Sequence, residues 1–130
     1  GLQAAVLEVK LEHLDEWNEK RRTVAEIYNE RLNGAVATPY VSSCAEPVYH
    51  LYVVQVEHRD GVKCKLEEIG IETGIHYPTP LPFTGAYKEQ GYKPDDFPVS
   101  SRLRTRILSL PMNDTLTDEE VNYVVSALNH

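Results

Sequence analysis

The residues best placed for chemistry in this 130-residue chain are His76 and Tyr77. They stand where an apolar stretch, residues 71–77, runs into residues 78–82, in which three of five residues are proline. Strands that end in loops often present functional groups on a rigid base. A loop stiffened by proline loses little conformational entropy when a ligand binds. His76 and Tyr77 are therefore candidates for a binding site, although their spacing alone leaves a structural role for His76 equally open.

Other histidines and cysteines form no catalytic pattern. His50 falls within an apolar stretch and is expected to be a satisfied core histidine, whereas His58 is expected at the surface. Cys44 and Cys64 have no CxxC partner or metal-ligand spacing and are expected to be unreactive free thiols. Neither a glycine-rich phosphate loop nor a zinc-binding motif occurs in the sequence.

The charged residues give no clearer signal. No two carboxylates have a spacing that supports acid–base catalysis. Arginines at 102, 104 and 106 could hold a phosphate or carboxylate, but a solvated helix face is the expected structure. Thirteen Lys and Arg against twenty Asp and Glu give a formal charge of −7, which argues against partners such as nucleic acid or an acidic membrane.

Length and composition indicate one domain spanning residues 1–130. No apolar run is long enough for a membrane span, and no export leader opens the chain. With only two cysteines, a cytoplasmic location is expected. The first residue is Gly1 rather than Met, so we expect either a processed chain or a piece of a longer one.

The first element to position is a long helix expected over residues 2–33, closed by Asn33 and Gly34. Its second half is amphipathic, but its first half is apolar almost all round, which requires cover on more than one side. Two arrangements provide this cover. The helix lies across a small sheet, or a missing domain or second subunit packs on it.

The remaining elements form a small α/β domain over residues 48–130. Strands are expected at 48–56, 71–77 and 107–110, and helices at 59–69 and 98–106. A last helix begins at Thr117, which forms a capping box with Glu120. The predicted fold class is α+β, with a small three-stranded sheet packed against helices and preceded by the long N-terminal helix.

An ordered set of short motifs covers essentially the whole chain and resembles one family. In chain order these motifs are Leu2-Gln3-Ala4-Ala5, Val9-Lys10-Leu11, His50-Leu51-Tyr52-Val53-Val54, Arg59-Asp60, Gly70-Ile71, Gly74-Ile75-His76-Tyr77-Pro78, Ala86-Tyr87, Asp96-Phe97-Pro98 and Leu108-Ser109-Leu110-Pro111-Met112. They resemble the C-terminal small domain of DegT/StrS-type sugar aminotransferases. These are pyridoxal-phosphate enzymes with the fold type I architecture of aspartate aminotransferase.

The resemblance implies that the parent enzyme aminates a keto-sugar nucleotide, with glutamate as the amino donor, and works as a homodimer. It also implies that the Schiff-base lysine and the aspartate on the pyridine nitrogen belong to an N-terminal large domain that is absent here. The lysines of this chain do not match the family's lysine motif. The fragment alone is therefore expected to be inactive and to bind no pyridoxal phosphate, while His76 and Tyr77 would contact the substrate.

Three departures from the family pattern leave the substrate open. They lie at Leu81-Pro82-Phe83, where a second histidine is common, at Ser100-Ser101, and at Asn113-Asp114. Two alternative functions also remain: a stand-alone, non-catalytic binding or interaction domain, and a domain of a related pyridoxal-phosphate sugar dehydratase.

Overall fold

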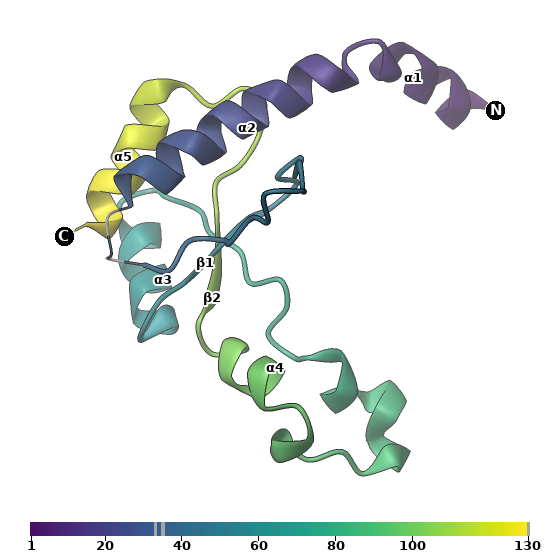
Figure 1. Cartoon of the computed structure of the whole chain (residues 1–130), viewed down its shortest axis with the longest axis vertical. Coiled ribbons are helices and arrows are strands. Elements are labelled where there is room, and N and C mark those ends of the chain that lie inside the picture. The colour runs from purple at the N-terminus through teal and green to yellow at the C-terminus, as the bar shows by residue number, and fades with distance from the viewer. Residues whose placement is uncertain (33, 35, 130) are drawn as a thin grey trace.

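Helices flank a very small sheet in the computed structural model, which describes residues 1–32, 34 and 36–129 (Figure 1). The regular elements are α1 (Leu2–Leu11), α2 (Leu14–Arg31), β1 (Tyr52–Gln55), α3 (Arg59–Glu68), α4 (Pro98–Leu103), β2 (Ile107–Leu110) and α5 (Asp118–Leu128). Three short 3-10 turns lie between α3 and α4: η1 (Leu81–Phe83), η2 (Gly85–Gln90) and η3 (Pro94–Asp96). The predicted α+β class is confirmed.

Within the described residues the sheet has two strands, where the sequence predicted three. β1 and β2 are antiparallel, with Tyr52 opposite Leu110 and Gln55 opposite Ile107. The predicted strand at 71–77 contributes only one bridge to β2, between Gly74 and Ser109. Proline has no amide hydrogen to extend a ladder, and Pro78 follows within four residues. The first predicted strand is also shorter, because Tyr49 has a φ of 47° and cannot continue an extended segment.

The predicted continuous helix at 2–33 is two helices. The amide of His13 donates to the carbonyl of Lys10, three residues back, and this tight turn closes α1. The chain then restarts as α2 at a different angle, so that α1 extends away from the rest of the molecule (Figure 1). α2 ends at Arg31, and Gly34 adopts a φ of 77°, which favours glycine. Asn33, the other residue of the predicted stop, lies outside the described residues.

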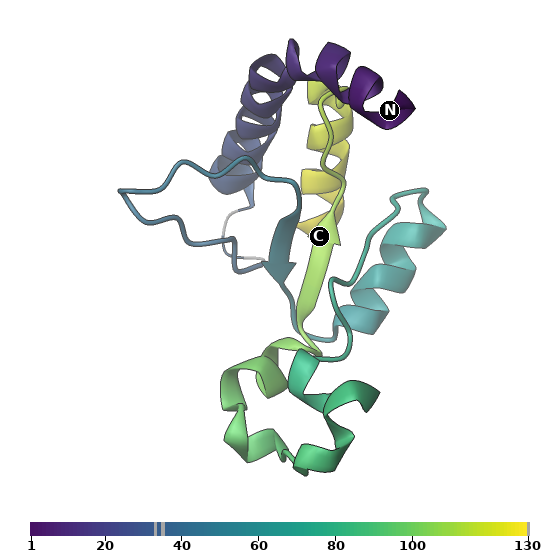
Figure 2. The same cartoon turned by 90° about the vertical axis from the view of Figure 1, so that its right-hand side faces the viewer.

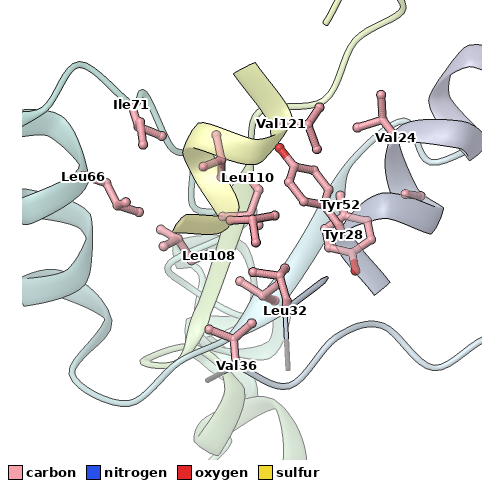
Figure 3. Packing of buried hydrophobic residues seen from close by; sticks show 14 of the residues in the cluster. Val24, Tyr28, Leu32, Val36, Tyr52, Leu66, Ile71, Leu108, Leu110 and Val121 are labelled. Atoms are coloured by element: carbon pink, nitrogen blue, oxygen red, sulfur yellow. The ribbon is translucent and has the colours of Figure 1, made fainter. Parts of the chain in front are cut away.

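The core forms where α2, α3 and α5 meet the sheet (Figure 3). Tyr28 from α2 and Tyr52 from β1 are fully buried, with ring centroids 4.9 Å apart. Their hydroxyls donate to the carbonyl of Pro111 at 3.0 Å and to Asn29 Oδ1 at 2.7 Å. Burial raises the pKa of both hydroxyls, so both stay protonated donors. The other buried apolar residues are Val24, Ala25, Leu32, Val36, Val54, Val56, Leu66, Ile71, Leu108, Leu110, Val121, Val124 and Val125.

Residues 81–103 form a small lobe on the side of the sheet away from α2 and α5 (Figures 1 and 2). None of η1, η2, η3 and α4 contains a buried residue. The lobe is held by an aromatic cluster in which Phe97 meets Phe83 and Tyr92 edge-on, at centroid distances of 6.2 and 5.2 Å. The helix predicted to end at Arg106 ends at Leu103.

α1 has no buried residue. Leu2, Leu7 and Leu11 are 85, 64 and 68% exposed. With Ala4, Leu14 and Trp17, Leu7 and Leu11 line an apolar groove of about 660 Å³. The interpretation of this helix as lying across the sheet is therefore wrong, and its apolar face has no cover among the described residues. No described helix is both long and apolar enough to cross a bilayer.

The exposed face of α1 predicts that the isolated chain self-associates. Replacing Leu7 and Leu11 together by Gln keeps helix propensity and net charge but removes two apolar side chains. We expect the dimer dissociation constant from sedimentation velocity to rise about 10-fold or more. The matched control is the pair Lys65→Gln and Glu68→Gln on exposed positions of α3, which should leave association unchanged. A wild-type chain that stays monomeric at high concentration contradicts this prediction.

The predicted capping box of α5 is confirmed. Glu120 N donates to Thr117 Oγ1 at 3.2 Å, and Thr117 N donates to Glu120 Oε2 at 2.8 Å. The backbone hydrogen bond from Thr117 lowers the pKa of Glu120. The stabilisation from this carboxylate is present above the pKa of an unfolded Glu, and it is lost as the pH falls through the lower folded pKa.

Removing the cap should destabilise the chain measurably. We expect Thr117→Ala to lower the free energy of unfolding by about 1 kcal/mol in chemical denaturation at neutral pH, because one amide at the start of α5 loses its acceptor. Ser126→Ala, at an exposed position within the same helix, should not destabilise the chain. Equal stability of Thr117→Ala and wild type would show that the capping box carries no net stabilisation.

Candidate functional site

The side chain of His76 is held against β2. Its Nδ1 lies 2.8 Å from Ser109 Oγ, a hydrogen-bond distance. Ser109 is the polar residue of β2 and lies between two leucines that enter the core. It is only 4% exposed. His76 itself is exposed, so one edge of the ring is fixed while the other remains accessible.

Gly74 provides the space in which this ring lies. It bridges Ser109 through two backbone hydrogen bonds, Gly74 N to Ser109 O at 3.0 Å and Ser109 N to Gly74 O at 2.7 Å. A Cβ added at Gly74 would come within 2.5 Å of His76 Cε1, closer than carbon atoms can approach. Any larger residue would therefore push the imidazole away from Ser109.

Tyr77 lies beside this seated imidazole. Its side chain is 72% exposed, and its ring meets that of His76 edge-on with centroids 5.5 Å apart. The peptide bond that joins the two residues is cis. The two residues singled out from the sequence therefore lie side by side at the surface, with an imidazole nitrogen and a phenol available to an external ligand.

The remaining histidines do not join this site. His50 is exposed and not a core residue, because the left-handed turn at Tyr49 places it in the loop before β1. His58 is exposed, as predicted, and Cys44 and Cys64 are exposed free thiols.

A cleft of about 580 Å³ beside the start of α3 is lined by Arg59, Arg102 and Arg106, and two of these three arginines are paired with carboxylates. The buried guanidinium of Arg59 donates to Asp60 Oδ1 at 2.6 Å and to the carbonyl of Ile107 at 3.1 Å. Arg106 pairs with Glu57. The predicted solvated face holds for Arg102 and Arg104, which are exposed, whereas Arg106 is partly buried. This arrangement ties α3 to β2 and leaves little free positive charge.

Two contributors to the site, Ser109 and Gly74, were missed as functional residues. The sequence signals were present: Ser109 is a lone polar residue in an apolar strand, and Gly74 lies two residues before His76. Neither signal identifies its partner, because Ser109 and His76 are 33 positions apart.

The described residues do not by themselves form a pyridoxal-phosphate site. A Schiff base needs a lysine in a sheltered pocket, and every lysine of the chain is exposed or, for Lys63, partly buried and paired with Glu67. No group of three or more His, Cys, Asp or Glu that could bind a metal occurs among these residues either.

Sequence and fold together match one class of protein. The model of the DegT/DnrJ/EryC1/StrS aminotransferase family matches residues 1–129. The chain belongs to this family.

Individual relatives agree with this assignment. The chain is 40% identical over 129 residues to the erythromycin biosynthesis sensory transduction protein EryC1 of Saccharopolyspora erythraea, covering 98% of this chain and 35% of that protein. It is 39% identical over 129 residues to dTDP-3-amino-3,6-dideoxy-alpha-D-galactopyranose transaminase of Aneurinibacillus thermoaerophilus, with the same shares covered. The solved structure of DesV from S. venezuelae in complex with a ketimine intermediate superposes with a TM-score of 0.90 at 33% identity, covering 97% of this chain and 34% of that one.

The chain therefore spans about a third of the length of the relatives it matches. The other two thirds of those proteins have no counterpart among residues 1–130. This fact agrees with the lack of a sheltered lysine.

The role of Gly74 in holding the His76 ring against Ser109 can be tested by mutation. In Gly74→Ala the imidazole should leave Ser109, so that the nuclear Overhauser contact between the His76 ring and the Ser109 side chain disappears. The free energy of unfolding should fall by about 1–2 kcal/mol, because the buried Ser109 hydroxyl loses its partner, about 1–3 kcal/mol, and the lower entropy of the unfolded alanine chain offsets only about 0.4–1 kcal/mol. Gly85→Ala, where an added Cβ meets nothing within 4 Å, is the control. An unchanged contact in Gly74→Ala would show that the ring does not need this space.

Proposed function

We propose that this chain supplies the substrate-side part of an aminotransferase that aminates a keto-sugar nucleotide. The observation that carries the proposal is the exposed pair His76 and Tyr77, with His76 fixed through Ser109 to the strand that also anchors the core. A rigidly held imidazole and an adjacent phenol suit the hydroxyl and phosphate oxygens of a nucleotide sugar. The transaminase names of similar proteins support the same substrate class.

Pyridoxal phosphate would serve the parent enzyme as the electron sink of transamination. In this proposal the Schiff-base lysine and the phosphate contacts of the cofactor come from outside this chain. In this proposal His76 and Tyr77 bind and orient the sugar nucleotide and do not carry the amino group. The proposed amino donor is glutamate.

We further propose that the apolar face of α1 packs against the part of the parent protein that corresponds to the remaining two thirds of its relatives. α1 is the first element of the chain, and its leucines are largely exposed. We also propose that two parent subunits pair as a homodimer, as the family resemblance implies. The free, exposed thiols of Cys44 and Cys64 suit a reducing compartment such as the cytoplasm.

A transaminase is favoured over a stand-alone binding module or a dehydratase. The family model covers nearly the whole chain, and several relatives are named as transaminases. The uncovered face of α1 also argues against a module that works alone.

The test uses the protein expressed from the complete reading frame that encodes this chain. With a keto-sugar nucleotide and glutamate, we expect formation of the amino sugar and 2-oxoglutarate. His76→Ala should raise KM for the sugar nucleotide about 10-fold, the cost of one hydrogen bond to a ligand, while KM for glutamate stays unchanged. His58→Asn, which replaces another exposed histidine and tolerates its left-handed backbone, is the control.

Three outcomes would contradict the proposal. A dehydrated sugar in place of the amino sugar would identify the dehydratase. A reading frame without a large domain would leave a stand-alone module. An equal effect of His76→Ala on both substrates would remove His76 from the sugar side.

A further inference from the structure

A buried serine makes the only polar contact of the His76 ring among the described residues. Ser109 Oγ lies 2.8 Å from Nδ1, and the serine is 4% exposed. A hydroxyl has one hydrogen to donate, and a neutral imidazole has one nitrogen that donates and one that accepts. The direction of this single hydrogen bond therefore decides which nitrogen of His76 carries the proton.

Hydrogen-bond accounting at Ser109 determines the direction. Among residues 1–32, 34 and 36–129, the one polar atom that contacts the Ser109 hydroxyl is His76 Nδ1. If Nδ1 donated to Ser109, the serine hydrogen would be buried without an acceptor, which is unfavourable. If Ser109 donates to Nδ1, both groups are satisfied and the imidazole proton lies on Nε2.

We propose that Ser109 is a positioning residue that holds His76 as the neutral Nε2–H tautomer, and so makes His76 a hydrogen-bond donor to its ligand. The inference rests on the proposed function, because it specifies how the same site would recognise its substrate. Ser109 acts through His76, and its backbone is fixed on both sides, by β1 and by the bridge to Gly74.

The tautomer defines the ligand chemistry. Nε2–H binds an acceptor, which in a sugar nucleotide is a phosphate, hydroxyl or keto oxygen. It does not accept a hydrogen bond from an ammonium group, so His76 would bind the keto sugar through its oxygens and offer no acceptor to the new amino group. Tyr77, beside the ring, has a hydroxyl that either donates or accepts and does not impose this selection.

Nitrogen-15 NMR of the imidazole tests the tautomer without any substrate. The full chain, labelled at histidine, is measured at pH 8, above the ordinary pKa of histidine, where protonated and unprotonated ring nitrogens have well separated shifts. The free histidine side chain already favours Nε2–H, so the diagnostic quantity is the change on mutation. We expect the ratio of Nε2–H to Nδ1–H to fall about 2- to 10-fold in Ser109→Ala. This factor corresponds to the net free energy of one neutral hydrogen bond.

Two further variants separate positioning from a general structural effect. Ser109→Thr keeps the hydroxyl and should restore the wild-type ratio, whereas Gly74→Ala displaces the ring and should lower the ratio while Ser109 is intact. Ser126→Ala, on an exposed position of α5, should change nothing. A wild-type ring protonated mainly on Nδ1, or an unchanged ratio in Ser109→Ala, overturns the inference.

A titration with thymidine diphosphate glucose, on the protein expressed from the complete reading frame and labelled in the same way, separates the two proposals. Shifts of the His76 ring on titration support the substrate-side role, and binding weakened about 2- to 10-fold in Ser109→Ala supports positioning through His76. If the tautomer responds to Ser109→Ala but no ligand shifts the ring, the proposed function fails while the assignment of the tautomer stands. If the ligand shifts the ring equally in both proteins, Ser109 is not a positioning residue.

Discussion

The hydrogen-bonded register of β2 is the constraint on which both the core and the candidate site depend. Alternate residues of a strand point to opposite faces. In β2, Leu108 and Leu110 are directed into the core beside Tyr52 (Figure 3). Ser109, which lies between them, contacts His76. Pairing with β1 fixes one edge of β2, and the bridge to Gly74 fixes the other. A shift of one residue in register would place Ser109 in the core and a leucine at His76.

A sheet this small depends on the helices for its stability. A two-stranded ribbon is marginal in water unless helices or further strands cover it. Here α2, α3 and α5 provide that cover, and the contact between Tyr28 and Tyr52 joins α2 to β1. Arg59, the buried first residue of α3, donates a hydrogen bond to a β2 carbonyl and so joins α3 to the sheet. The surface that presents His76 is therefore rigid because the core beneath it is packed.

Local rules predicted the elements, and tertiary contacts decided where the predictions failed. The cap at Thr117 and the strand at 107–110 follow from capping and periodicity, which act within a few residues. The third strand failed because composition indicates an extended chain but not whether a partner strand runs alongside it. The prediction that His50 lies in the core was wrong because Tyr49 has a left-handed backbone conformation, which the residue type of Tyr49 does not indicate. For the site, His76 and Tyr77 were found from strand-end position and proline content, whereas Ser109 required the fold.

The departures from the family pattern fall outside the packed core. Leu81-Pro82-Phe83 forms η1 and Ser100-Ser101 lies in α4, both in the lobe that contains no buried residue. Asn113 and Asp114 follow β2 in a loop, where Asp114 lies 3.7 Å from Arg21 and Asn113 accepts hydrogen bonds from Thr115. Substitutions at such positions alter local polar contacts and leave the buried apolar cluster intact, so they change the fold little. Because the lobe follows directly from the proline segment after Tyr77 and contributes no residue to the core, substitutions in it leave the contact between His76 and β2 in place.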